Sequence, residues 1–168
     1  MDKTINDVRS FWDANPLLTG ELDVAAGTEQ WFKRFDEIKT HEVFLGDLSL
    51  FIPSDMGGKR VLDIGCGPGY WNRIFGKMNV EYHGIDISPK TIEMAQKSKA
   101  LFGLHGTVAV GNAEHLDFPD EHFDFVISTG VIHHTPDTQA CINEIHRVLR
   151  RGGEARIGVY YKNAIFRS

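Results

Sequence analysis

The sequence is short of the features that mark several large classes of protein. Its 168 residues include only two cysteines, Cys66 and Cys141, so we expect no disulfide framework and two reduced thiols. It contains no apolar run long enough to cross a bilayer, so we expect no membrane span. Its 18 Lys and Arg residues are outnumbered by 23 Asp and Glu residues, for a formal net charge of −5. That balance argues against an electrostatic footprint for nucleic acid.

The N-terminal residues also lack the charged-then-apolar layout of a secretion signal, so the cytoplasm is the expected location. With 42% hydrophobic residues, the chain is long and apolar enough to bury one sizeable core.

The most informative segment that is present joins a buried strand to a glycine turn; it reads V-L-D-I-G-C-G-P-G over residues 61–69. Its glycines follow a G-x-G-x-G spacing, which differs from the G-x-G-x-x-G of dinucleotide sites. Asp63 ends the strand, where a carboxylate would repel a pyrophosphate but attract a cation. The segment therefore predicts a nucleotide-type pocket for a cationic ligand. S-adenosylmethionine fits, because it carries an ammonium and a sulfonium.

A second acid stands where such a pocket would hold a ribose. Asp86 ends the predicted strand 81–85, about 20 residues after Gly65, and a carboxylate there can accept from both ribose hydroxyls. Its alternative role is to cap the next helix. We favour ribose binding, because Ser88 and Pro89 already supply an N-cap and a first-turn proline.

A third polar site follows the predicted strand near 107–111. Asn112 can accept from the exocyclic amine of adenine, while the backbone N–H of Ala113 or Glu114 can donate to a ring nitrogen. The alternative is that Asn112 only shapes a turn.

Beyond residue 58, short apolar strands alternate with amphipathic helices. This pattern predicts an α/β fold with a doubly wound, mostly parallel, Rossmann-like sheet and helices on both faces. We expect strands near 60–64, 81–85, 107–111, 123–129 and 154–161. We expect helices near 70–78, 89–102 and 138–149.

Residues 1–57 stand apart as a helical extension or lid, before a cofactor-binding domain at 58–168. A first helix includes Val8, Phe11 and Trp12, and Asn15-Pro16 and Gly20 break it. A second apolar stripe follows, made of Trp31, Phe35, Ile38, Leu45, Leu48 and Ile52. Packing against the sheet explains most of these residues. Trp12, Trp31 and Phe32 are also candidates for a lid that excludes water from the cofactor.

Taken together, these blocks resemble the class I SAM-dependent methyltransferases, in particular the small-molecule branch with a UbiE-like domain. The likeness covers residues 58–161 and rests on D-I-G-C-G-P-G, G-I-D-I-S, G-N-A-E, residues 120–128, V-I-H-H and L-R-R-G-G. It implies an enzyme that transfers a methyl group from S-adenosylmethionine to a small-molecule acceptor and releases S-adenosylhomocysteine. The cofactor-binding residues that it implies are Asp63, Gly65, Cys66, Gly67, Asp86, Ile87, Asn112, Ala113 and Thr129.

Methyl transfer is a displacement at an activated carbon, so the protein need not supply a nucleophile or a metal. His134 is the candidate general base for an acceptor that must lose a proton, and His133, Tyr160 and Tyr161 are further candidates. Tyr160 is also a candidate substrate contact. Similar quinone O-methyltransferases carry two glutamates and a histidine at the segment 130–134, and only the last histidine remains here. We therefore expect no metal site.

The C-terminal strand alternates apolar and polar residues, which is typical of a strand with one solvated face. The family's sheet continues into a C-terminal hairpin that is not found after this strand. We therefore expect either a truncated chain or a homodimer that covers this edge. Other functions stay open: a non-catalytic SAM-binding module, a fragment of a longer methyltransferase, or an NAD-dependent oxidoreductase. Asp63 and the glycine spacing count against the last of these.

Overall fold

Five parallel strands among the described residues form one sheet in the order β3-β2-β1-β4-β5. They are β1 (Arg60–Ile64), β2 (Glu81–Asp86), β3 (Thr107–Val110), β4 (Phe123–Thr129) and β5 (Leu149–Gly158). This computed structural model describes residues 3–17, 22–43 and 45–159. The strand order reverses between β1 and β4. In open α/β sheets, ligands bind beside the carboxyl ends of the strands at such a point.

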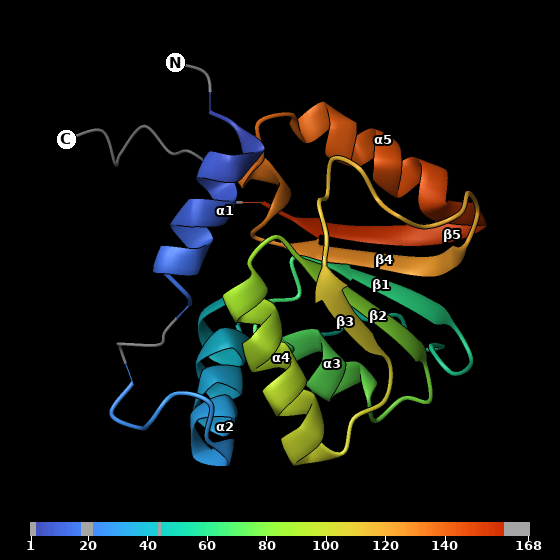
Figure 1. Ribbon diagram of the computed structural model, residues 1–168. Coiled ribbons are helices and arrows are strands. Elements are labelled where there is room, and N and C mark those ends of the chain that lie inside the picture. Colours follow the sequence, from blue (N-terminus) through green and yellow to red (C-terminus); the bar gives the residue numbers. More distant parts are fainter. Residues whose placement is uncertain (1–2, 18–21, 44, 160–168) are drawn as a thin grey trace.

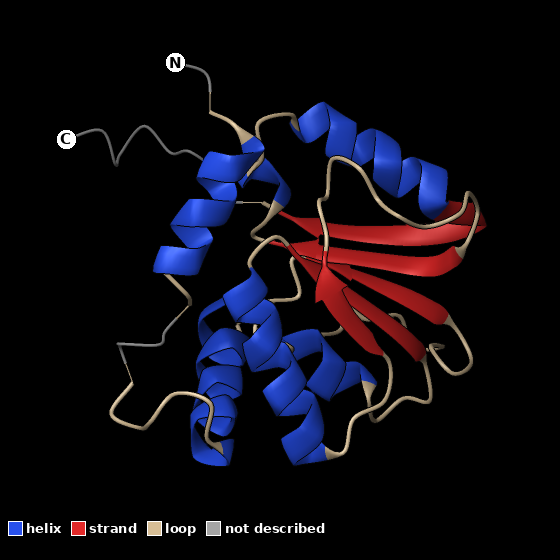
Figure 2. Cartoon of the chain, in the orientation of Figure 1, coloured by secondary structure: helices blue, strands red, loops and turns tan. Residues whose placement is uncertain are grey.

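Helices cover both faces of this sheet (Figure 1; Figure 2). On one face lies α5 (Thr138–Val148), and on the other lie α2 (Glu29–Ile38), α3 (Tyr70–Phe75) and α4 (Pro89–Phe102). The first helix, α1 (Ile5–Ala14), lies beyond the carboxyl ends of β4 and β5. Two short helical turns complete the set: the π-helical η1 (Lys39–Val43) and the 3-10 helix η2 (Ile132–His134). The predicted doubly wound fold is confirmed.

Most predicted boundaries agree with the structure, and the exceptions have local causes. The helix predicted over 70–78 ends at Phe75, and Gly76 is its C-cap. The last strand begins at Leu149 instead of 154, because Leu149 already pairs with Phe123 before a register shift in β4 and β5. The second apolar stripe is helical only to Val43, and Leu45 is 88% exposed. The predicted end of the last strand at 161, Gly20 and Tyr160 lie outside the described residues.

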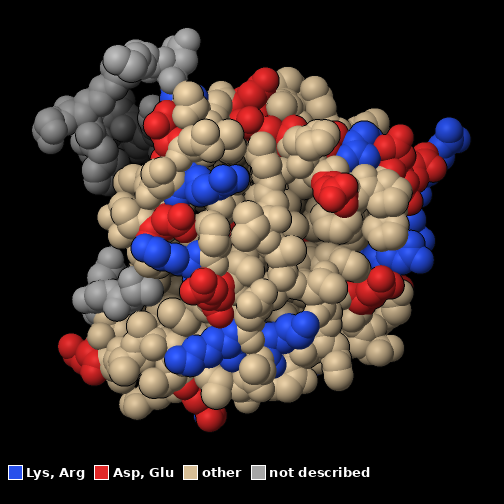
Figure 3. Space-filling model, in the orientation of Figure 1, with Lys and Arg blue, Asp and Glu red and all other residues tan. Residues whose placement is uncertain are grey.

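The surface carries charges of both signs. On the face in Figure 3, Lys and Arg side chains lie among Asp and Glu side chains. Exposed ion pairs of the protein include Arg60 with Glu81, across β1 and β2, and Lys33 with Glu29, along α2. Exposed pairs of this kind contribute little to stability.

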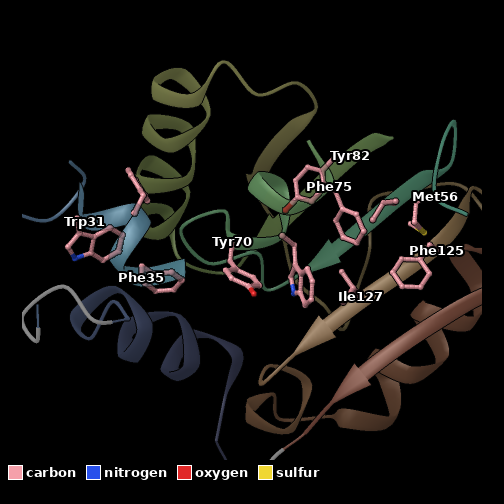
Figure 4. Packing of buried hydrophobic residues seen from close by; sticks show 11 residues of the cluster. Trp31, Phe35, Met56, Tyr70, Phe75, Tyr82, Phe125 and Ile127 are labelled. Carbon is pink, nitrogen blue, oxygen red and sulfur yellow. The ribbon is translucent and has the colours of Figure 1, made fainter. Parts of the chain in front are cut away.

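The core on the α2 side of the sheet is aromatic. Figure 4 shows aromatic side chains of this cluster packed between α2, α3 and the sheet. The buried members of this cluster are Trp31, Phe32, Phe35, Met56, Val61, Tyr70, Trp71, Phe75, Tyr82, Phe125 and Ile127. A second cluster, on the α5 side, is mostly aliphatic and includes Leu62, Ile64, Cys141 and Ile145. Because α2 contributes three of the aromatic side chains, residues 29–38 are part of the core of the fold.

A buried arginine connects the aromatic cluster to the glycine turn. Arg73 binds both carboxylate oxygens of Asp36 in α2, at 2.5 and 2.7 Å. It also donates to the backbone oxygen of Pro68 at 2.8 Å and to Ser98 Oγ in α4 at 2.6 Å. Its guanidinium lies 4.9 Å from the ring centroid of Phe32. One side chain thus joins α2, α3, α4 and the turn.

Removing this arginine should destabilise the fold strongly. We expect Arg73→Ala to lower the free energy of unfolding by about 3 to 5 kcal/mol, because Asp36 would be left partly buried without its partner. Arg34→Ala is the matched control, since Arg34 forms an exposed ion pair with Glu37; it should cost at most about 1 kcal/mol. Urea denaturation measures both. Equal losses in the two variants would contradict this account of Arg73.

Candidate functional site

The glycine turn after β1 has the backbone that a close ligand approach needs. The N–H groups of Gly65 and Cys66 donate to the backbone oxygen of Ile85 at 2.8 and 2.9 Å, so the turn is tied to β2. Gly65 has a φ of 74°, and a Cβ there would meet Val131 Cγ2 at 2.2 Å. Gly67 has a φ of 54°, and a Cβ there would meet nothing within 4 Å. Gly65 is therefore needed for packing, and Gly67 leaves open space at the turn.

Asp86 braces the turn and keeps capacity for a ligand. Its Oδ2 accepts from the Gly67 N–H at 3.1 Å, and its Oδ1 accepts from the Ser88 N–H at 3.0 Å. A carboxylate can accept about four hydrogen bonds, so two positions remain for the hydroxyls of a ribose. Burial raises the pKa of Asp86, against the backbone hydrogen bonds that lower it. Ser88 accepts from the Thr91 N–H at 3.1 Å, as expected of an N-cap.

A cavity of about 450 Å³ lies at the carboxyl ends of the strands. It brings together most of the residues predicted to bind the cofactor: Gly65, Gly67, Asp86, Ile87, Asn112, Ala113 and Thr129. Asp63 and Cys66 do not belong to its wall, and both are buried behind the turn. Cys66 thus contributes a small side chain beneath the turn and no contact surface to the cavity.

Asp63 occupies a more protected position than its motif predicts. Tyr82 donates its hydroxyl to Asp63 Oδ2 at 2.6 Å. Burial raises the pKa of Asp63 to about 7, against the Tyr82 hydrogen bond and the Lys39 charge, which lower it. At neutral pH the site therefore holds a carboxyl near half protonation in place of a fixed negative charge.

At the predicted adenine end, Asn112 shapes the turn after β3. Its Oδ1 accepts from the Glu114 N–H at 3.0 Å, so that N–H is already used. The side chain thus has the turn-forming role that was the alternative to adenine binding, while Asn112 and Ala113 both line the cavity. Of the two backbone donors considered for adenine, Ala113 is the one that remains a candidate.

The wall near β4 holds Thr129 and His134. Trp71 donates its indole N–H to Thr129 Oγ1 at 3.2 Å, which fixes this side chain at the end of β4. His134 lines the cavity, and its ring lies 5.4 Å from that of Trp12, edge to face. Burial lowers the pKa of His134, and the neighbouring His133 and Lys3 lower it further. His134 is therefore mostly neutral at pH 7 and able to accept a proton.

Helix α1 closes one side of the cavity, and polar contacts hold it at both ends. The Lys3 ammonium donates to the backbone oxygen of His134 at 2.7 Å. At the other end, Ser88 Oγ donates to Asp13 Oδ1 at 2.5 Å, and Lys90 donates to the Asp13 backbone oxygen at 3.2 Å. Trp12 lines the cavity between these ends.

The other lid candidates lie elsewhere. Trp31 and Phe32 are fully buried in the aromatic cluster and do not line the cavity, so the structure gives them the packing role. Tyr160 lies outside the described residues.

Several residues of the cavity wall were not singled out from the sequence as ligand contacts. They are the apolar residues Ile5, Val8, Leu17, Phe35, Ile38 and Phe51, and one cation, Lys39. The periodicity of α1 and α2 does identify an apolar face, but it does not tell core from cavity. Lys39 follows an amphipathic helix, where a lysine is normally assigned to solvent. Lys39 is the C-cap of α2 and keeps α-helical dihedral angles, so it lies on the same side of the helix as Phe35, four residues earlier, and lines the same cavity.

Residues 3–17, 22–43 and 45–159 contain neither a metal-site cluster nor a membrane-spanning helix. Within these ranges, no three or more His, Cys, Asp or Glu residues are grouped as a metal site would need. In the same part of the chain, no helix is long and apolar enough to cross a membrane.

Comparison with known families agrees with this geometry. A family model described as a methyltransferase domain matches residues 62–157, which is more than half of the chain. The chain belongs to the methyltransferase domain family. The match covers β1 to β5 and every predicted cofactor-binding residue. The NAD-dependent alternative finds no support in it.

Relatives with curated names are also methyltransferases. A fatty-acid O-methyltransferase of Mycolicibacterium smegmatis is 34% identical over 70% of this chain and 43% of its own length. A 2-methyl-6-phytyl-1,4-hydroquinone methyltransferase of Oryza sativa is 39% identical over 61% of this chain and 30% of its own. A phthiotriol/phenolphthiotriol dimycocerosates methyltransferase of Mycobacterium tuberculosis is 37% identical over 59% of this chain and 37% of its own. The chain thus spans less than half the length of these relatives.

Solved structures share the fold. The YcgJ protein of Bacillus subtilis is 30% identical, with a TM-score of 0.66 over 72% of this chain and 52% of its own. An arsenic(III) S-adenosylmethionine methyltransferase of Chlamydomonas reinhardtii is 32% identical, with a TM-score of 0.58 over 63% of this chain and 40% of its own.

S-adenosylmethionine is the cofactor of this family, and the residues present fit it. The open space at Gly67, the acceptors of Asp86 and the polar turn at Asn112 follow one another along a single cavity. A phosphate-bearing coenzyme would instead meet the Asp86 carboxyl, which lines the cavity and accepts from the Gly67 N–H of this turn.

The raised pKa of Asp63 predicts how stability changes with pH. The folded protein binds the Asp63 proton more tightly than the unfolded chain does. Raising the pH from the ordinary value of 3.8 through about 7 therefore lowers the stability that this group contributes. Asp63→Asn keeps an acceptor for Tyr82 but does not titrate. Relative to the wild type, the variant should gain stability as the pH rises from 5 to 8. Thermal unfolding across this range measures the difference; parallel pH profiles would contradict it.

Proposed function

We propose that this chain carries out SAM-dependent methyl transfer to a small, largely apolar acceptor. The observation that supports this most directly is the lining of one cavity, whose residues we group by their chemistry into two parts. A polar part follows the glycine turn, Asp86 and Asn112 along the strand ends, and an apolar part is formed by α1, α2 and Phe51. The first part suits the cofactor, and the second suits the acceptor.

In the polar part, each predicted residue has a role that its chemistry supports. Gly65 and Gly67 let the backbone approach the methionine end, Asp86 accepts from ribose hydroxyls, and Ala113 donates to adenine. Thr129, held by Trp71, lies at the floor near the sulfonium. When bound, S-adenosylmethionine supplies a methyl group on a positively charged sulfur. The protein therefore has to orient the acceptor and exclude water.

In the apolar part, the side chains favour a hydrocarbon-rich acceptor. Ile5, Val8, Leu17, Phe35 and Ile38 present no hydrogen-bonding group. The named relatives act on a fatty acid, a phytyl hydroquinone and phthiotriol dimycocerosates, all with long apolar portions. We infer an acceptor with one polar reacting group and an apolar body, such as a long-chain acid or a prenylated hydroquinone.

His134 lines the same cavity, beside Trp12 of α1. Its lowered pKa keeps the imidazole neutral at pH 7, so it can accept a proton from an acceptor hydroxyl. We propose it as the general base for acceptors that ionise during transfer. An acceptor that is already anionic would not need it.

A non-catalytic SAM-binding module is the second candidate, since the chain spans less than half of its curated relatives. A further proposal concerns β5, an edge strand of the described sheet on which Ile157 is 37% exposed. Such an edge suits pairing with a second copy of the chain. A cytoplasmic location and the absence of nucleic-acid binding stay predictions.

The decisive experiment separates binding from turnover. Calorimetry with S-adenosylhomocysteine tests the cofactor site, and transfer of labelled methyl to a panel of long-chain acids and prenylated hydroquinones tests the acceptor site. Binding together with turnover supports the enzyme, and binding without turnover on any acceptor supports the module. If the folded protein does not bind S-adenosylhomocysteine, both the enzyme and the binding module are refuted.

Asp86→Ala should weaken S-adenosylhomocysteine binding by at least about tenfold, because two hydrogen bonds to a carboxylate would be lost. Asp117→Ala, which removes an exposed carboxylate, is the control and should bind like the wild type. Calorimetry gives the affinities and circular dichroism verifies folding. Unchanged affinity of a folded Asp86→Ala variant would refute the ribose assignment.

Trp12→Ala tests the apolar part. We expect the KM for an apolar acceptor to rise by about tenfold, because a large aromatic contact is lost. The affinity for S-adenosylhomocysteine should change much less. Phe11→Ala is the matched control, since the adjacent Phe11 is 55% exposed and does not line the cavity. Equal effects of the two substitutions on KM would contradict a direct acceptor contact for Trp12.

A further inference from the structure

A lysine at the C-terminal end of α2 lines the cavity. Helix α2 ends at Ile38, and η1 (Lys39–Val43) continues it with π-helical geometry. Such turns are frequent at functional sites, because they re-aim side chains at the cost of regular hydrogen bonding. A hydrogen bond of 2.8 Å between Thr40 Oγ1 and the Tyr70 hydroxyl ties η1 to the start of α3, next to the glycine turn. The position of Lys39 is thus fixed relative to that turn.

The Lys39 ammonium lies over the Tyr70 ring, which favours a cation, but it contacts no anionic side chain among the described residues. It lies 5.0 Å from the ring centroid of Tyr70, a cation–π arrangement. Within the described part of the chain, it forms no ion pair and no side-chain hydrogen bond, although it lines the cavity. Burial lowers the pKa of Lys39, while the Asp63 charge acts in the opposite direction. A cation in a largely apolar wall is costly unless something anionic meets it.

The methionine end of the cofactor supplies such an anion. Besides its ammonium, this end carries a carboxylate, and none of the cofactor-binding residues predicted from the sequence is cationic. Lys39 lines the same cavity as Gly65 and Gly67, where the methionine end is expected. Asp63, behind the turn, favours the charged form of Lys39 and so favours anion binding there.

We propose that the Lys39 ammonium binds the methionine carboxylate of S-adenosylmethionine. This inference rests on the proposed function and assigns to that site a cationic residue from the N-terminal extension.

The test compares two probes that differ only in the carboxylate: S-adenosylmethionine and decarboxylated S-adenosylmethionine. We expect the wild type to bind the first at least about tenfold more tightly, because a charge-assisted contact is lost with the second. In Lys39→Met, which keeps the stem over Tyr70, this preference should fall to about one. Lys39→Arg should retain most of it. Calorimetry measures all six affinities, and thermal unfolding verifies that each variant is folded.

Lys33→Met is the matched control, because Lys33 lies on the exposed face of α2 and pairs with Glu29. It should keep the wild-type preference. A folded Lys39→Met variant that still discriminates between the probes as the wild type does would overturn the inference. So would a Lys39→Met variant that binds both probes normally but loses affinity for a long-chain acid, since Lys39 would then serve the acceptor. If the wild type binds neither probe, the proposed function itself fails.

Discussion

The bidentate ion pair between Arg73 and Asp36 is the contact on which the site most depends. Arg73 reaches from α3 to α2, to the backbone of Pro68 in the glycine turn and to Ser98 in α4. A guanidinium can serve these partners together because its donors lie in a rigid plane. The turn that approaches the cofactor is thereby held from behind by the same side chain that holds α2. Geometry at the site and packing of the N-terminal region are therefore coupled.

This coupling changes how the first 57 residues should be understood. The extension is not one mobile cover: α2 is built into the aromatic cluster through Trp31, Phe32 and Phe35. Helix α1 forms another side of the cavity and is held by Lys3 at one end and Asp13 at the other. A helix held by a few polar contacts can open locally at a much lower free energy than a helix in the core.

The pKa shifts of the site residues are caused more by burial than by neighbouring charges. Asp63 and Asp86 both have raised pKa values because the strand ends are desolvated. Lys39 has a lowered pKa for the same reason. Burial thus disfavours the charged forms of two acids and one base, and a zwitterionic ligand end would favour those charged forms when it binds. The site is poised to respond to its ligand and to pH.

The sequence by itself determined the parallel sheet, the glycine turn and the acids that follow β1 and β2. These features are local: apolar strands, glycines with positive φ and strand-end polar residues leave a pattern within a few positions. Only the tertiary structure decided which of these groups meet the ligand. It placed Asp63 behind the turn and Trp31 in the core, and it brought Lys39 to the cavity wall. Such outcomes depend on which helix packs against which face of the sheet, and residue spacing along the sequence does not determine that packing.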